Sequence, residues 1–226
     1  MSPVNLYPKK YGQVLLKNKN VALQEVLLLG DISGRSVLEI GPGPGTLTEI
    51  LLQKGAVVTA IESDHRFYEI LKMKFESQIK GGTLKIEKND FLELGGGNPD
   101  FIIGNIPYHI SSPILFHLEK FNFTRSVLMV QLEFARRMVG KPGTEDYSRL
   151  SISTALRYRV KLEKNSKKGE FLSSSSCRFR HCFNRTKSGK MGILRRTYRK
   201  NSYGNFLPEK KKTEKYNKKP ARRSHG

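Results

Sequence analysis

The sequence has little cysteine, no tryptophan and no long uninterrupted apolar run. Its two cysteines, Cys177 and Cys182, are too few for a disulfide framework and fit a reducing compartment. The apolar runs fall short of the ~20 residues that a membrane-spanning helix requires. The amino terminus lacks the basic and then apolar layout of a signal peptide. We therefore expect a cytoplasmic protein with no membrane partner.

Acidic residues are also scarce, with 20 Asp and Glu against 41 Lys and Arg and a formal net charge of +21. The excess is uneven. Residues 1–164 hold 22 basic and 17 acidic residues, a net charge of +5, whereas residues 165–226 hold 19 and 3, a net charge of +16. The length suits one domain with a small appendage. We expect a compact domain over 1–164 and a basic, disordered tail over 165–226, with no compact fold from about Leu172.

Metal ligands are not arranged in a convincing set. Cys177, His181 and Cys182 form one small cluster, and a lone cluster without further ligands is seldom a metal site. His109 and His117 are more often surface or core residues than catalysts. We expect no metal site.

Short β-branched segments alternate with segments of helical periodicity. Strands are predicted at 36–40, 56–62, 83–87, 100–104 and 126–131, and helices at 20–29, 46–55, 66–79, 112–120 and 132–139. In the 66–79 helix one face is predicted to carry Phe67, Ile70, Leu71, Phe75 and Ile79. This alternation is typical of an α/β fold with a doubly wound, mostly parallel sheet.

Four marked positions follow the predicted strands: the glycine run Gly41–Gly45, Glu62, Asp90 and Asn105. Ligands of such sheets bind beyond the carboxyl ends of the strands. These positions therefore predict one common site at that edge.

The glycine run Gly41-x-Gly43-x-Gly45 departs from the dinucleotide fingerprint, because Thr46 stands where the last glycine belongs. Its two prolines lack amide donors, which suits pyrophosphate capture poorly. Glu62 is placed to accept hydrogen bonds from ribose hydroxyls. S-adenosylmethionine has no phosphate, so this pattern favours that methyl donor over NAD. The alternative is a tight strand-to-helix turn beside an ordinary surface glutamate, and Asp90 alone is as easily a helix cap.

The run Asn105-Ile106-Pro107-Tyr108 suggests a pocket for a nucleobase amine. The Asn105 side-chain oxygen and the carbonyl of Ile106 or Pro107 would accept the amine hydrogens and turn its lone pair toward the methyl group. Pro107 would fix the backbone, and Tyr108 would stack on the base. A base inside a duplex would have to be flipped out to reach this pocket. The alternative is a turn that ends a strand, with a core tyrosine.

With these motifs the chain resembles the small-subunit rRNA adenine N6,N6-dimethyltransferases. The sequence of the motifs is more similar to archaeal and eukaryotic members than to bacterial ones. The resemblance runs to about Glu163 and is carried by the segments 8–13, 39–43, 89–90, 104–108, 111–113, 141–143 and 147–151. It implies a Rossmann-like, S-adenosylmethionine-dependent methyltransferase fold over residues 1–164, followed in the family by a small helical domain.

The resemblance also assigns roles. Val14, Leu16, Gly41, Glu62, Asp90 and Asn105 would bind S-adenosylmethionine, and Asn105, Pro107 and Tyr108 would form the catalytic pocket. The implied reaction is N6-dimethylation of two adjacent adenosines in a hairpin near the 3′ end of small-subunit (16S) rRNA. The implied partner is the pre-30S particle, and the protein is expected to be a monomer. Val14 departs from the family, which usually has a polar residue there, and this would weaken cofactor binding.

The tail departs further, because the family's proline-rich motif and helical domain are missing. The codons TCC TCC TCC TCG TGT CGA TTC CGC CAT TGT would encode residues 173–182. Read one base later, they give Pro-Pro-Pro-Arg-Val-Asp-Ser-Ala-Ile, which is the missing motif. We hypothesise a frameshift near Phe171 that leaves the helical domain absent or scrambled, with cofactor binding retained and ribosomal activity weak. The alternative is a disordered basic tail that grips rRNA.

Three alternative functions compete with this one. A large-subunit rRNA methyltransferase of the macrolide-resistance type would share the Asn-x-Pro-Tyr pocket. A non-catalytic RNA-binding assembly factor would keep the fold and use the tail as its grip. An NAD-dependent oxidoreductase is disfavoured by Thr46 and by the lack of a placed acid–base histidine.

Overall fold

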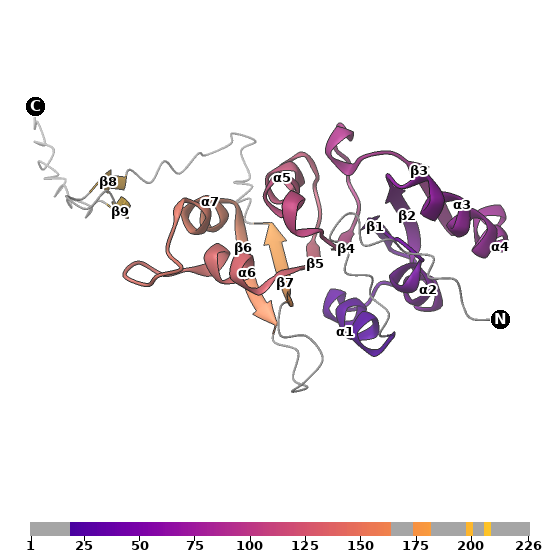
Figure 1. Ribbon diagram of the computed structural model, residues 1–226. Coiled ribbons are helices and arrows are strands. Elements are labelled where there is room, and N and C mark those ends of the chain that lie inside the picture. Colours follow the sequence, from indigo (N-terminus) through magenta and orange to yellow (C-terminus); the bar gives the residue numbers. More distant parts are fainter. Residues whose placement is uncertain (1–18, 164–173, 182–197, 201–205, 209–226) are drawn as a thin grey trace, which may run out of the picture. The chain divides into compact units, whose positions relative to one another are not determined.

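The structure is a computed structural model that describes residues 19–163, 174–181, 198–200 and 206–208 (Figure 1). The chain divides into two compact units, Met1–Phe183 and Asn184–Gly226. In the described part of the second unit, β8 (Tyr198–Lys200) pairs antiparallel with β9 (Phe206–Pro208). All other described elements belong to the first unit.

A sheet of seven described strands, in the order β3-β2-β1-β4-β5-β7-β6, forms the centre of the first unit. The first five strands in the chain are parallel, and β7 runs antiparallel to both β5 and β6. The predicted doubly wound, mostly parallel sheet is confirmed. The strands are β1 (Ser36–Ile40), β2 (Val57–Glu62), β3 (Leu84–Lys88), β4 (Phe101–Asn105), β5 (Arg125–Gln131), β6 (Tyr158–Glu163) and β7 (Ser174–His181).

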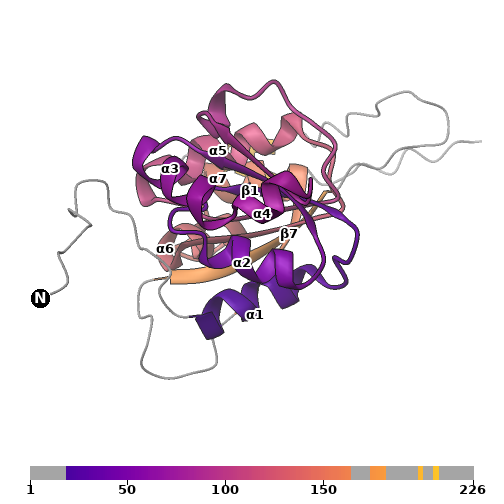
Figure 2. The same ribbon diagram turned by 90° about the vertical axis from the view of Figure 1, so that its right-hand side faces the viewer.

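Helices cover both faces of this sheet (Figure 2). The α-helices are α1 (Lys19–Leu29), α2 (Thr46–Gln53), α3 (His65–Lys74), α4 (Glu76–Lys80), α5 (Ser111–His117), α6 (Leu132–Val139) and α7 (Arg149–Arg157). Three short 3-10 helices are η1 (Phe91–Glu93), η2 (Tyr108–Ile110) and η3 (Leu118–Lys120). None of the helices described is long and apolar enough to cross a membrane.

Successive strand residues enter two different cores. Val37 packs in the core that includes residues of α1, α2 and α3, whereas Leu38 packs in the core that includes residues of α5 and α6. Ile103 and Ile102 repeat this division on β4, and both are fully buried. A sheet covered on both faces needs apolar residues at successive positions, which explains the continuous apolar runs of the sequence.

The predicted helix over 66–79 is wrong in one respect, because it is broken into α3 and α4 at Phe75. Phe75 leaves helical geometry, with φ −116° and ψ 27°, and its ring is buried against Gly45. Phe67 and Leu71 are buried as expected, but Ile70 is 39% exposed. The predicted apolar face is therefore divided between two short helices.

Strand β7 departs from the expectation that residues from about Leu172 take no part in a compact fold. It lies between β5 and β6, pairing Ser174 with Gln131 and His181 with Tyr158. The sequence from Cys177 to Arg180 alternates apolar and charged residues, which is the period of a strand. The sheet therefore extends past the expected boundary at Lys164.

Candidate functional site

The parallel register places three of the predicted site residues in one row. Ile40, the last residue of β1, lies opposite Ile61 on β2 and Gly104 on β4. The next residues are Gly41, Glu62 and Asn105. The glycine loop thus leaves the sheet between a carboxylate and an amide, as the strand-end argument predicts.

The glycine loop uses its own amides internally. Gly41 N–H donates to the Ile61 carbonyl (3.0 Å), Gly43 N–H to Glu62 Oε2 (2.9 Å) and Gly45 N–H to the Pro42 carbonyl (3.0 Å). All three glycines have positive φ, of 63°, 55° and 81°, a region that residues with a Cβ seldom adopt. The intervening prolines have no N–H, so the loop offers no amide from 41 to 45 to a pyrophosphate. This geometry argues against a dinucleotide.

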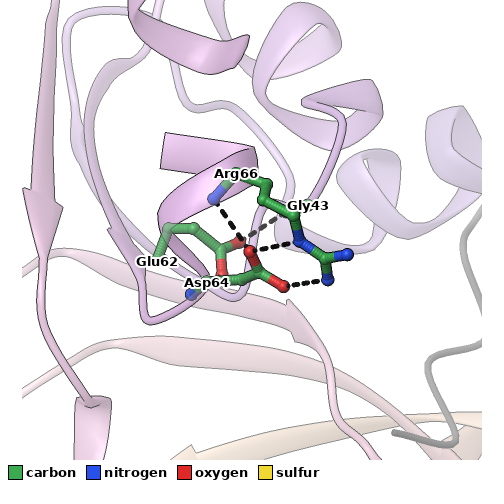
Figure 3. A network of polar contacts seen from close by, with 4 residues as sticks. All are labelled: Gly43, Glu62, Asp64 and Arg66. Carbon is green, nitrogen blue, oxygen red and sulfur yellow. Dashed lines mark hydrogen bonds and ion pairs between the residues drawn. The ribbon is translucent and has the colours of Figure 1, made fainter. Parts of the chain in front are cut away.

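Glu62 joins the loop to the turn after β2 (Figure 3). Its Oε2 accepts from Gly43 N–H, and its Oε1 accepts from Asp64 N–H (2.8 Å). Burial raises the pKa of this carboxyl, and the backbone donors oppose that effect. Each oxygen still has a lone pair for a ligand hydroxyl. The expected contact with a ribose therefore fits the geometry.

Asp64 and Arg66 hold the turn that carries Glu62. Asp64 caps α3 by accepting from Arg66 N–H (2.8 Å), and the guanidinium donates to both Asp64 oxygens (3.1 and 2.6 Å). Arg66 keeps the pKa of Asp64 below its ordinary value. The guanidinium of Arg66 is thus paired with Asp64, and the Glu62 carboxylate bonds the glycine loop instead.

Glu39 is a site residue for which no role was predicted. It is fully buried on β1, and Thr48 Oγ1 donates to its Oε2 (2.7 Å). Its Oε1 has no hydrogen-bond partner among the described residues. Burial raises its pKa to about 7, and the nearby Glu62 adds to the rise. A charged residue within the apolar strand Val37-Leu38-Glu39-Ile40 was the available signal.

Asp90 both caps a helix and stands at the carboxyl edge. Its Oδ1 accepts from Leu92 N–H (2.9 Å) at the start of η1, and the residue is exposed. Asn89 Oδ1 accepts from Asp90 N–H (2.8 Å). One carboxylate oxygen is thus used for the cap, and the second has no donor among the described residues.

Asn105 ends β4 with its side-chain oxygen buried. This Oδ1 finds no donor in the described part of the chain. Gly104 lets the strand reach this position, because a Cβ there would lie 2.6 Å from the Ile40 carbonyl oxygen. An unsatisfied buried acceptor is costly and rare, and often marks a functional site. It is the acceptor that an amine ligand would use.

The structure also distinguishes between the Ile106 and Pro107 carbonyls, either of which was predicted to accept a hydrogen bond beside Asn105. The Pro107 carbonyl already accepts from Ile110 N–H (3.2 Å) and from the buried Ser111 hydroxyl (3.2 Å). These bonds engage both of its lone pairs and leave the Ile106 carbonyl as the backbone acceptor. Tyr108 begins η2.

Val14 and Leu16 lie outside the described residues. Among the described residues, no group of three or more His, Cys, Asp or Glu side chains is placed to hold a metal ion. The site therefore consists of buried carboxyls, a glycine loop with engaged amides and an amide oxygen without a donor in the described chain. This set fits a nucleoside with free hydroxyls, a positive charge and no phosphate.

Comparison with known proteins agrees with this geometry. A relative from Thermococcus sibiricus, "Probable ribosomal RNA small subunit methyltransferase A", is 40% identical over 176 residues, which cover 76% of this chain and 62% of the relative. The crystal structure of a dimethyladenosine transferase from Plasmodium falciparum is 32% identical with a TM-score of 0.64, covering 74% of this chain and 63% of that one. The 23S rRNA methyltransferase ErmE is 25% identical with a TM-score of 0.62, covering 73% and 68%.

The chain spans less than two thirds of the Thermococcus and Plasmodium proteins. Its fold is the Rossmann-like fold that these methyltransferases share. The sequence model of the family described as ribosomal RNA adenine dimethylase matches residues 4–208. The chain belongs to the ribosomal RNA adenine dimethylase family.

Proposed function

We propose that the protein transfers methyl groups from S-adenosylmethionine to N6 of two adjacent adenosines near the 3′ end of small-subunit rRNA, as a step of small-subunit biogenesis. The observation that carries the proposal is the buried Asn105 Oδ1, which has no donor among the described residues and lies in one row with Gly41 and Glu62. The partner is the pre-30S particle, and the protein works as a monomer in the cytoplasm.

The protein's part in the reaction is to orient a weak nucleophile. Asn105 Oδ1 and the Ile106 carbonyl accept the two amine hydrogens, which turns the nitrogen lone pair away from the ring. Tyr108 stacks on the base, and Pro107 limits the freedom of the loop. S-adenosylmethionine supplies an electrophilic methyl group on a sulfonium, so positioning and exclusion of water provide most of the acceleration.

Cofactor binding is assigned to six residues. Gly41 lets the backbone approach the ligand closely, Glu62 accepts from the ribose hydroxyls, and Asp90 accepts from the adenine amine. Asn105 lies between the cofactor and the target base. Val14 and Leu16 close over the cofactor from the amino-terminal segment, where Val14 gives up a polar contact.

We further propose the frameshift near Phe171, with residues 1–164 as the catalytic domain and 165–226 as a basic tail translated out of frame, of which β7 adds a strand to the sheet of that domain. The residues of β7 fall within the stretch whose hypothetical codons restore the family motif. The gene's nucleotide sequence tests this directly: neither alternative frame will contain the Pro-Pro-Pro-Arg-Val-Asp-Ser motif if the idea is wrong. On this hypothesis the chain binds the cofactor and modifies ribosomal particles weakly.

Transfer of labelled methyl groups to purified, undermodified subunits tests the reaction. We expect label in small subunits above the level of an Asn105→Ala control, recovered as N6,N6-dimethyladenosine. Equal label from both proteins, or no cofactor binding by calorimetry, would refute the proposal.

The same experiment tests a second candidate. The similarity to ErmE favours large-subunit rRNA as the alternative substrate, and label in large subunits would select it. RNA binding without transfer would select the non-catalytic assembly factor.

A further inference from the structure

The exposed cations of the described chain differ in whether an acid neutralises them. Between Lys19 and Lys88, seven of nine Lys and Arg residues form ion pairs within 4.0 Å. Between Leu132 and Leu150, Arg136, Arg137, Lys141 and Arg149 are all exposed, and none has a described carboxylate within that distance. We call these four residues the α6–α7 cations.

The turn between α6 and α7 holds these cations together. The Ser151 hydroxyl donates to the Arg137 carbonyl (2.6 Å), which ties the end of α6 to the first turn of α7. Thr144 N–H donates to the Lys141 carbonyl (3.1 Å), and Tyr147 N–H donates to the Thr144 carbonyl (3.1 Å). The backbone that carries the cations is thus ordered by its own hydrogen bonds.

Helix physics explains only part of this arrangement. Arg136 and Arg137 stand in the last turn of α6, where cations are favoured, but Arg149 is the first residue of α7. The helix macrodipole disfavours a cation there, and α7 has no acid in its first turn. Glu133, Glu145 and Asp146 lie in the same segment, yet none forms an ion pair with a described cation. Neither its own helix nor a described acid therefore stabilises the charge of Arg149.

The cations lie one short helix away from the proposed pocket. Met129 on β5 pairs with Asn105, and its carbonyl accepts from Ile106 N–H (2.9 Å). Two residues after Met129 the strand ends, and α6 begins at Leu132. An eight-residue helix is about 12 Å long, so its far end lies within reach of a nucleic acid that enters the pocket. Figure 1 shows α6 and α7 side by side next to β5 and β6.

We propose that the α6–α7 cations bind the phosphate backbone of the RNA that flanks the target adenosine. This inference rests on the proposed function for its partner, but its test measures binding and not methyl transfer. The cations hold the RNA in register, and the pocket selects the base. Such contacts neutralise phosphates and release counterions, so they give the affinity a salt dependence.

The test compares double variants of the full chain on a synthetic RNA hairpin with two adjacent adenosines in its loop. The variants are Arg136→Gln with Arg137→Gln, and Lys141→Gln with Arg149→Gln. The matched control is Lys80→Gln with Lys85→Gln, which removes two exposed cations that are paired with acids. Fluorescence anisotropy over a series of salt concentrations gives the dissociation constant and its salt slope, and the tail is present throughout.

Each phosphate contact contributes about 0.7–0.9 to the slope of log K against log salt. We expect each α6–α7 double variant to lose about 1.5 from that slope, while the control keeps the parent's slope. Cofactor affinity stays unchanged, and the Arg149 variant unfolds at the same or a higher temperature, because a cation leaves a helix N-terminus. Parental slopes in both α6–α7 variants, or an equal loss in the control, would overturn the inference. If the parent binds RNA with this pattern but transfers no methyl group, the proposed reaction fails and the surface stands.

Discussion

Glu39 provides the sharpest test of the electrostatics beneath the glycine loop. Its carboxyl is fully buried, accepts from Thr48 and has a second oxygen without a described donor. Burial raises its pKa from the ordinary 4.5 to about 7. Between these two values the folded protein keeps a proton that the unfolded chain has released.

The sign and size of the effect follow from this difference. Since the folded state binds the extra proton, the free energy of unfolding falls as pH rises through that window. A pKa shift from 4.5 to about 7 corresponds to about 3 kcal/mol of unfolding free energy, because each pKa unit is worth about 1.36 kcal/mol. The contribution is fully present below pH 4.5 and lost above about pH 7. Glu39→Gln, which has the same shape and no ionisable proton, is expected to remove this dependence.

Urea unfolding at a series of pH values measures the prediction. The parent's free energy of unfolding should decline by about 3 kcal/mol more than that of Glu39→Gln across the window. Glu76→Gln, which changes an exposed acid on α4 that is paired with Lys80, serves as the control and should follow the parent. Parallel pH profiles for the parent and Glu39→Gln would show that the buried carboxyl titrates normally and that the reasoning is wrong.

Three further substitutions probe the site. Asn105→Ala should lower turnover by about 10²-fold or more, because a preorganised hydrogen-bond partner is lost, and should lower cofactor affinity by a smaller factor; single-turnover kinetics and calorimetry separate the two effects. Ser111→Ala frees one lone pair of the Pro107 carbonyl and should lower kcat about tenfold, and rescue by Ser111→Thr distinguishes positioning from packing. Gly45→Ala should cost about 2–4 kcal/mol of unfolding free energy in thermal or urea melts, since φ is +81° and the new Cβ meets Phe75 Cε2 at 2.6 Å.

The sheet was the most predictable part of the molecule. The predicted strands 36–40, 56–62, 83–87, 100–104 and 126–131 agree with β1–β5 within one residue at each end. Apolar, β-branched runs bounded by glycines and acids define such strands locally. Parallel topology then places their carboxyl ends at one edge, so the neighbourhood of Gly41, Glu62 and Asn105 follows from sequence order.

The last part of the sheet was not predictable in the same way. α7, β6 and β7 were missed, and β7 enters the sheet between β5 and β6 out of sequence order. Its serine-rich start has no apolar run, and only the alternation from Cys177 to Arg180 indicates a strand. The break at Phe75 likewise depends on a distant contact with Gly45, which helical periodicity does not contain.

The choice between the two carbonyls after Asn105 shows what local pattern leaves undecided. Sequence reasoning offered Ile106 and Pro107 equally, because both carry a backbone oxygen next to the amide. The structure gives the Pro107 oxygen two internal donors, Ile110 N–H and the Ser111 hydroxyl. The segment that follows the pocket thus fixes the pocket's backbone at Pro107. The Asn105 side-chain oxygen and the Ile106 carbonyl remain to accept the two hydrogens of an adenine amine. Within the described residues, the number of acceptors without a donor therefore matches the number of amine hydrogens, which is the physical reason to expect a base amine, and not a hydroxyl, at this site.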